Sequence, residues 1–226
     1  MRTPRICGVV PMKPVTLAKS RLSAALQPEA RAALVRAMAA DVLDALVSSR
    51  RLERVVVVTS DPSLGALAVE RGCVAAPERV PGGLNCQLEA VAEALELEGF
   101  DTMLVVPADV PCLRPADVCR LLDAHAGGVT ACVSTVDQGT NALVVSPPGA
   151  VPMLFGPGSG PRYLGACRSR GIAARELVID GLRDVDRPAD LEWLGEEGVG
   201  TRSWSVLRRS GVRAPRSSHW EASCVA

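Results

Sequence analysis

The sequence predicts an α/β protein with one domain, built on a mostly parallel sheet that has helices on both faces. Aliphatic segments typical of buried strands alternate with segments of helical period along most of the chain. The 226 residues, 48% of them hydrophobic, are enough for one domain with a substantial core. Aromatic residues make up only 3%, so Val, Leu, Ala and Ile must form that core, as expected for parallel strands.

In the first half of the chain, strands and helices are predicted in alternation. Strands are expected at 5–10, 54–59, 73–76 and 102–106, and helices at 28–48, 62–71 and 86–98. Pro28 suits the first turn of a helix, and the apolar residues after it recur at helical spacing. The segment 11–21 is too rich in proline for a helix. Asn85 is placed to cap the helix predicted at 86–98.

In the second half, a helix at 115–126 precedes two strands at 129–136 and 141–146, which the polar turn 137–140 separates. The glycine-rich loop 156–161 leads into a helix at 162–170, followed by a strand at 174–179 and a helix at 189–196. From Thr201 onward, Ser and Arg are frequent and neither period is present. We therefore expect a domain at 1–200 and a basic, disordered tail at 201–226.

The overall charge excludes several classes of partner. The chain has 25 basic and 25 acidic residues, and the tail holds five Arg against one Glu, which leaves a mildly acidic body. Nothing therefore suggests a nucleic acid partner.

No secretory signal or long apolar run is present, so we expect a cytoplasmic protein without a membrane partner. The eight cysteines lack a C-x-x-C pair and are expected to be reduced thiols, not zinc ligands.

Both lysines of the chain, Lys13 and Lys19, lie in the loop 11–21 directly after the first strand, and Arg21 ends this loop. Ligands of open α/β sheets bind at the carboxyl ends of the strands. No G-x-x-x-x-G-K-[ST] motif is present, so the loop is not a P-loop. In the alternative interpretation, both lysines are surface residues that lie in this loop by chance. Their placement together in one loop at the end of a strand favours a phosphate site.

Three carboxylates follow predicted strands at the same edge. Asp109 comes after the strand 102–106, and Asp184 and Asp186 project to the same side of an extended segment. Like charges this close repel unless a cation lies between them. Mg²⁺ binds carboxylates together with substrate phosphates. A turn could explain Asp109, and capping of the helix after Pro188 could explain one of the other two carboxylates but hardly both.

Taken together, these segments resemble the 2-phospho-L-lactate guanylyltransferase family of coenzyme F-420 biosynthesis, which also includes phosphoenolpyruvate and 3-phosphoglycerate guanylyltransferases. Each matching segment is weak alone, but their order is specific. They are 10–22 (VPMKPVTLAKSRL), 83–88 (GLNCQL), 106–113 (VPADVPCL), 140–143 (TNAL), 155–159 (FGPGS) and 184–191 (DVDRPADL). No counterpart to the tail is recognised.

The resemblance implies a nucleotidyltransferase fold of the glycosyltransferase-A type, a Rossmann-like mixed sheet of seven strands between helices. It implies two Mg²⁺ ions held by Asp109, Asp184 and Asp186, and GTP phosphates held by Lys13, Lys19 and Arg21. The loop at Gly82, Gly83 and Asn85 would face the guanine. Thr140, Gly156 and Ser159 would receive the phosphorylated acid. From the residues alone, the glycine-rich loop at 156–160 is an anion site at a helix N-terminus or simply a flexible loop.

The acceptor acid is not decided by the sequence. The Ala- and Arg-rich composition is typical of a GC-rich, actinobacterial source, for which the resemblance ranks phosphoenolpyruvate first, ahead of 2-phospho-L-lactate and 3-phosphoglycerate. An enzyme of the same fold for a sugar phosphate or molybdopterin is one alternative, although its first loop would usually be glycine-rich. A non-catalytic nucleotide-binding module is the other. The expected partners are small molecules, and a homodimer is one oligomeric state that the sequence allows.

Overall fold

A seven-stranded sheet runs through the part of the chain that the computed structural model describes, residues 2–78 and 81–211. Its spatial order is β3-β2-β1-β4-β6-β5-β7. Only β6 runs antiparallel to its neighbours, so the expected mostly parallel, mixed sheet is confirmed. The strands are β1 (Ile6–Pro11), β2 (Arg54–Val58), β3 (Val74–Ala76), β4 (Thr102–Val105), β5 (Gly128–Val133), β6 (Thr140–Ser146) and β7 (Ala174–Leu177).

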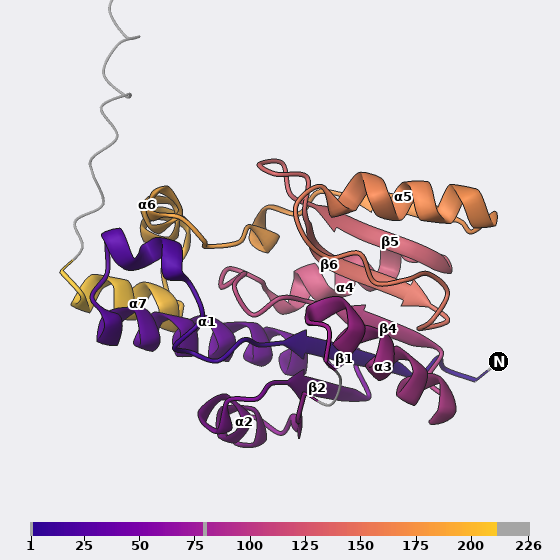
Figure 1. Ribbon diagram of the computed structural model, residues 1–226, viewed down its shortest axis with the longest axis horizontal. Coiled ribbons are helices and arrows are strands. Elements are labelled where there is room, and N and C mark those ends of the chain that lie inside the picture. Colours follow the sequence, from indigo (N-terminus) through magenta and orange to yellow (C-terminus); the bar gives the residue numbers. More distant parts are fainter. Residues whose placement is uncertain (1, 79–80, 212–226) are drawn as a thin grey trace, which may run out of the picture.

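Helices cover both faces of this sheet (Figure 1). One face packs against α1 (Pro28–Ser48), α2 (Pro62–Val69), α4 (Pro115–Ala124), α6 (Pro188–Glu197) and α7 (Arg202–Arg209). The other face packs against α3 (Leu84–Leu97) and α5 (Ser159–Arg170). Two short 3₁₀ helices, η1 (Ser20–Ala24) and η2 (Asp180–Leu182), lie in the connections.

The strands are buried on both sides, which explains their aliphatic composition. In β4, Leu104 belongs to the core on the α1 side, whereas Met103 and Val105 belong to the core on the α3 side. This is the two-residue alternation of an extended strand. Burial of apolar surface contributes about 25 cal/mol per Å², so side chains buried on both faces of the central strands stabilise the fold.

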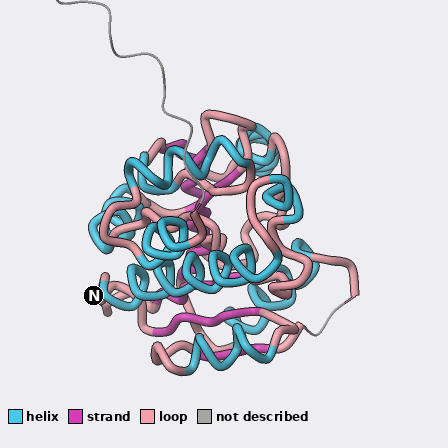
Figure 2. The backbone as a smooth tube through the Cα atoms, turned by 90° about the vertical axis from the view of Figure 1, so that its left-hand side faces the viewer, coloured by secondary structure: helices cyan, strands magenta, loops and turns pink. Residues whose placement is uncertain are grey.

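The carboxyl ends of the parallel strands β1, β2 and β4 form one edge of the sheet. In Figure 1, β1 runs from the N-terminus at the right toward the left, so this edge lies on the left of the view. Figure 2 turns this edge toward the viewer and shows helices on both sides of the strands. The loops that carry the predicted phosphate and metal residues begin here.

All the predicted strands and helices are present, with ends that differ by a few residues. The prediction that Asn85 caps α3 is wrong, because the N-cap is Gly83, at φ 82° and ψ −166°. Glycine adopts this backbone conformation without a steric cost. Helix α5 begins at Ser159, earlier than predicted, since Pro161 lies in its first turn, where no helical hydrogen bond is lost.

The expectation of a disordered segment from Thr201 onward is wrong for residues 201–211, which continue the fold through α7. Thr201 caps this helix, and the Asp41 carboxylate of α1 accepts hydrogen bonds from the backbone N–H groups of Arg202 and Ser203 at 3.0 and 2.9 Å. Leu207 is buried against the core. The rest of the predicted tail, 212–226, lies outside the described residues.

Within the described ranges, no helix combines the length and the apolar character that crossing a membrane requires.

Asp41→Ala tests the docking of α7. The side chain of Asp41 is only 8% exposed and also accepts a hydrogen bond from the Ser203 hydroxyl at 2.6 Å. Its loss leaves the backbone N–H groups of Arg202 and Ser203 without their acceptor, so we expect the free energy of unfolding in urea to fall by about 2–3 kcal/mol. Asp123→Ala is the control, since that exposed carboxylate pairs with Arg51 alone among the described residues and should cost below ~0.5 kcal/mol. Equal losses in both variants would contradict this account of α7.

Candidate active site

Two chain segments carry the three predicted metal carboxylates, and one backbone hydrogen bond joins them. Asp109 lies in the loop after β4, and Asp184 and Asp186 lie between η2 and α6. The backbone N–H of Val185 donates to the carbonyl oxygen of Asp109 at 2.9 Å. The Val185 side chain is fully buried in the core. The aspartates on either side of it therefore project away from the core, toward the same edge as Asp109.

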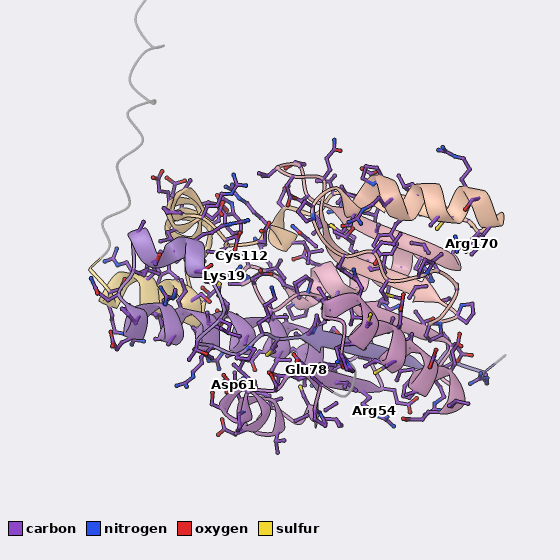
Figure 3. All side chains as sticks on the ribbon, viewed as in Figure 1. Lys19, Arg54, Asp61, Glu78, Cys112 and Arg170 are labelled. Carbon is purple, nitrogen blue, oxygen red and sulfur yellow. The ribbon has the colours of Figure 1, made fainter. Side chains whose placement is uncertain are left out.

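Lys19 lies between these carboxylates. Its Nζ atom is 2.6 Å from Oδ2 of Asp109 and 3.4 Å from Oδ1 of Asp186, and its side chain is 9% exposed. Figure 3 shows Lys19 on the side of the molecule where η1 contacts α6. Arg21, on η1, lies 2.5 Å from the other oxygen of Asp186 but is 66% exposed. The structure thus brings two of the three predicted phosphate-binding cations onto the predicted metal ligands.

The backbone of Lys19 is left-handed, with φ 56° and ψ 38°. A non-glycine residue in this region costs energy and persists only where surrounding contacts hold it. Here Lys19 is the N-cap of η1, and its carbonyl accepts the backbone N–H of Leu22 at 3.0 Å. From this position its ammonium group contacts the two carboxylates.

Asn141 supports Asp184 and was missed by the sequence analysis. The register of β6 on β5 shifts between Val133 and Cys132, so that β6 has an extra residue at Asn141. Such a bulge re-aims a side chain. The Asn141 Nδ2 atom donates to the Leu182 carbonyl at 2.6 Å and lies 3.5 Å from Oδ1 of Asp184. The position of Asn141 in the 140–143 motif beside Thr140 was the available signal.

Asp190, also missed, fixes the backbone of Asp186. Its Oδ2 atom accepts hydrogen bonds from the backbone N–H groups of Asp186 and Arg187 at 3.0 and 2.8 Å. Its Oδ1 atom lies 3.2 Å from Nη2 of Arg183. Asp190 is therefore the residue that closes the turn before α6, the capping role that the sequence analysis considered for Asp186. This arrangement leaves both oxygens of Asp186 to Lys19 and Arg21.

The charges of the cluster shift its pKa values in opposite directions. Burial raises the pKa of Asp184, and the nearby negative charge of Asp109 raises it further. Burial opposes the charge of Asp186 too, but Lys19 and Arg21 outweigh it and lower the pKa of Asp186. For Lys19, burial by itself would lower the pKa, and the pairing with Asp109 reverses the direction to a raised pKa. Asp184 is thus the carboxylate whose charge is least compensated.

The donor set fits a hard divalent cation. Three carboxylates from two joined segments offer oxygen ligands, and an added cation would relieve the repulsion between Asp184 and Asp109. No set of three acidic, His or Cys side chains in the described residues is already gathered as metal ligands. In this structure the ammonium group of Lys19 lies between Asp109 and Asp186.

The loop that carries both lysines is fastened to α2 by Asp61. The Asp61 Oδ2 atom accepts the backbone N–H of Val15, and its Oδ1 atom accepts that of Ser63 as the N-cap of α2, both at 2.9 Å. An Asp directly before Pro62 is a helix-start pattern that the sequence analysis did not use. Lys13 is exposed in this loop and is not brought to the carboxylates.

The two glycine-rich loops lie side by side at the α3 and α5 face. The Asn85 side chain donates to the Phe155 carbonyl at 3.2 Å and accepts the Phe155 N–H at 2.9 Å. This pair joins the loop at Gly82 and Gly83 to the loop at Gly156. A Cβ on Gly82 would lie 2.7 Å from the Cys86 sulfur, and φ is +121°, so this loop requires glycine.

Thr140 and Ser159 are brought together as predicted for one site, but both are buried, Thr140 at 5% exposure and Ser159 completely. Its hydroxyl donates to Oγ1 of Thr140 at 2.8 Å. In this conformation Ser159 supports Thr140 and the start of α5, and does not face solvent. Gly156, by contrast, is exposed beside them.

A cavity of about 360 Å³ borders Asn141 and Arg183 but none of the three carboxylates. Buried thiols of Cys112 and Cys132 and the ring of Trp193 form part of its wall. This cavity is therefore distinct from the edge that holds Lys19 and the carboxylates.

The family described as "Guanylyl transferase CofC like" matches residues 6–223. A phosphoenolpyruvate guanylyltransferase of Sphaerobacter thermophilus is 39% identical over 200 residues, 87% of this chain and 96% of that protein. A 2-phospho-L-lactate guanylyltransferase of Methanothermobacter thermautotrophicus is 32% identical over 209 residues, 91% of each.

A solved structure described as a nucleotide-diphospho-sugar transferase, from Desulfovibrio desulfuricans, has a TM-score of 0.77 at 15% identity and covers 92% of this chain and 95% of that one. At this identity the likeness concerns the fold, and it confirms the predicted nucleotidyltransferase fold.

Asp61→Ala tests the fastening of the lysine loop. The hydrogen bonds from Val15 and Ser63 lower the pKa of Asp61, so the ionised form stabilises the fold above the ordinary carboxyl pKa of about 4, and this stabilisation is lost as pH falls through the lowered value. We expect the variant to lose about 1–2 kcal/mol in urea unfolding at pH 7. The difference in free energy of unfolding between Asp61→Ala and the wild-type protein should shrink below pH 4. A pH-independent difference would refute the role of the Asp61 charge.

Proposed function

The chain belongs to the CofC-like guanylyl transferase family, and on this premise we propose that it transfers GMP from GTP to the phosphate of a small phosphorylated acid and releases pyrophosphate. The observation that carries the proposal is the convergence of Lys19 and Arg21 with Asp109, Asp184 and Asp186 at the carboxyl edge of the sheet. Cations for phosphates and carboxylates for a divalent metal are the two requirements of nucleotidyl transfer.

In the proposed reaction, a phosphate oxygen of the acid attacks the α-phosphorus of GTP. A new phosphorus–oxygen bond forms while the bond to the bridging oxygen of the β-phosphate breaks, and pyrophosphate leaves with the electron pair. The attacking phosphate is largely ionised at neutral pH, since its second pKa is about 6, so no general base is needed. Catalysis then depends on positioning and on neutralising negative charge.

Each part of the site has a proposed role. Asp109, Asp184 and Asp186 would hold Mg²⁺, two ions by resemblance to the family, and bound Mg²⁺ supplies neutralisation of the phosphate charge. Lys13, Lys19 and Arg21 would bind the triphosphate.

The glycine-rich loops would bind the two organic groups. Gly82, Gly83 and Asn85 would face the guanine, and Thr140 and Gly156 would receive the acid, with Ser159 holding Thr140 in place.

We propose phosphoenolpyruvate as the acceptor and coenzyme F-420 biosynthesis as the pathway. The name of the Sphaerobacter relative supports this acceptor, whereas the name of the Methanothermobacter relative supports 2-phospho-L-lactate. A non-catalytic module is disfavoured because all three carboxylates are present, and two of them, Asp109 and Asp186, pair with Lys19 or Arg21. The seven described cysteines all carry free thiols, which supports work in the reducing cytoplasm, and a homodimer stays part of the proposal.

Pyrophosphate release in the presence of GTP and Mg²⁺ tests the function directly. We expect release with phosphoenolpyruvate at the highest kcat/KM, followed by 2-phospho-L-lactate and 3-phosphoglycerate, and only background release without an acid. A parallel assay with a sugar phosphate tests the alternative acceptor. Release with the sugar phosphate alone, or GTP binding without turnover on any acceptor, would refute the proposal.

Asp184→Asn should separate activity from stability. Burial and Asp109 disfavour the charge of Asp184, so its neutralisation should leave the free energy of unfolding unchanged or higher, as for other strained site residues. Turnover should fall on the order of a thousandfold. Asp109→Asn should lose activity equally, and Asp123→Asn, at an exposed position, should keep it. Turnover close to that of the parent protein in Asp184→Asn would refute the proposal that Asp184 is a metal ligand.

Lys13→Ala should weaken GTP binding without affecting the fold. The side chain is exposed, so truncation costs little stability. Loss of one charge-assisted hydrogen bond to a phosphate corresponds to roughly a tenfold rise in Kd, measurable by calorimetry with Mg²⁺ present. Arg36→Ala, an exposed cation on α1, is the matched control. Unchanged GTP affinity in Lys13→Ala would show that this lysine does not contact the nucleotide.

A further inference from the structure

The proposed function requires Lys19 to bind GTP phosphates, although in this structure its ammonium group occupies the proposed metal position. That group lies against two of the carboxylates that are to hold the metal. A divalent cation coordinated by Asp109 and Asp186 would take the oxygens that Lys19 now contacts. Two cations of the same sign repel at such a distance. The ammonium group and the metal therefore compete for one position.

The surroundings of Lys19 allow its side chain to leave while its backbone stays. The Asp61 carboxylate fastens the loop through Val15, and the buried Leu22 anchors η1 on the other side. Lys19 has four rotatable methylene groups between this fixed backbone and the charge. The movement requires no change in protonation, because the group remains an ammonium ion throughout.

Asp184 supplies an entry point for the metal. Lys19 and Arg21 both contact Asp186, and Lys19 contacts Asp109, whereas the side chain of Asp184 accepts from the neutral amide of Asn141 at 3.5 Å. A cation attracted first to Asp184 arrives beside the other two carboxylates, where it outcompetes a single positive charge.

We propose that Lys19 is the resident cation of the carboxylate cluster, and that metal binding displaces its ammonium group from Asp109 and Asp186 to the nucleotide phosphates. This inference rests on the proposed function. It assigns Lys19 two successive partners, carboxylates before the metal binds and phosphates afterwards. In both states positive charge therefore lies against the carboxylates, and the phosphate-binding cation is released only where a metal is present.

Acylation of the wild-type protein tests this displacement, because the chain has only two lysines, Lys13 and Lys19. Acetic anhydride labels free amines, and mass spectrometry can follow each lysine separately. Without metal, Lys19 should react slowly relative to the exposed Lys13. Saturating Mn²⁺ should raise the rate at Lys19 about tenfold and leave Lys13 unchanged, since the amine loses its carboxylate partners. Adding GTP should protect Lys19 again.

Lys19→Gln gives a second readout, with Lys13→Gln as the matched control. Without nucleotide, Lys19→Gln should bind Mn²⁺ with a Kd lowered roughly tenfold, because the competing charge is gone. In the presence of Mn²⁺ it should bind GTP about tenfold more weakly. Lys13→Gln should change the GTP affinity alone. Circular dichroism shows whether the variants fold, and the acylation result stands without them.

The outcomes distinguish this inference from the function on which it rests. If Mn²⁺ binds, as seen by electron paramagnetic resonance, but leaves Lys19 acylation unchanged, Lys19 is a permanent partner of Asp109 and the displacement is refuted. Mn²⁺ affinity that is equal or weaker in a folded Lys19→Gln variant refutes the competition. If the wild-type protein binds no Mn²⁺ with or without GTP, the proposed function fails as well.

Discussion

The ion pair between Lys19 and Asp109 is the interaction around which the carboxyl edge of this sheet is arranged. Three carboxylates so close together would repel one another and open the loops that carry them. The buried ammonium at 2.6 Å from Asp109 and 3.4 Å from Asp186 compensates two of these charges. The backbone hydrogen bond from Val185 to Asp109 then keeps the two segments at a fixed distance. The site that we propose for a metal and a triphosphate is thus held together by the chain's own side chains.

The fold supplies this site through features far from it in the sequence. A bulge in the single antiparallel strand β6 aims Asn141 at the segment of Asp184, and Asp190 of α6 fixes the backbone of Asp186. Asp61 fastens the lysine loop to α2. Each of these polar side chains satisfies backbone groups at the end of a strand or helix, where regular hydrogen bonding stops. The rigid sheet consequently ends in loops that are themselves well ordered.

The sequence predicted the strands, the helices and the placement of Lys19, Arg21 and the three aspartates at one edge of the sheet, because aliphatic runs and parallel-sheet geometry depend on local pattern. It did not predict α7, whose helical face becomes stable only against α1 through Asp41. Nor did it find that Asn85 bonds to Phe155 instead of capping α3. The contact between Lys19 and Asp109 joins residues 90 positions apart. Pairings of this range depend on the folded arrangement, and local patterns do not contain them.

The most direct test of the account is a crystal structure of the protein with Mn²⁺ and a non-hydrolysable GTP analogue, with the metal located by its anomalous scattering. The account predicts metal density in contact with Asp109, Asp184 and Asp186, and the Nζ atom of Lys19 within hydrogen-bond distance of a phosphate oxygen. Metal held by other residues, or Lys19 still paired with Asp109 while the nucleotide is bound, would contradict it.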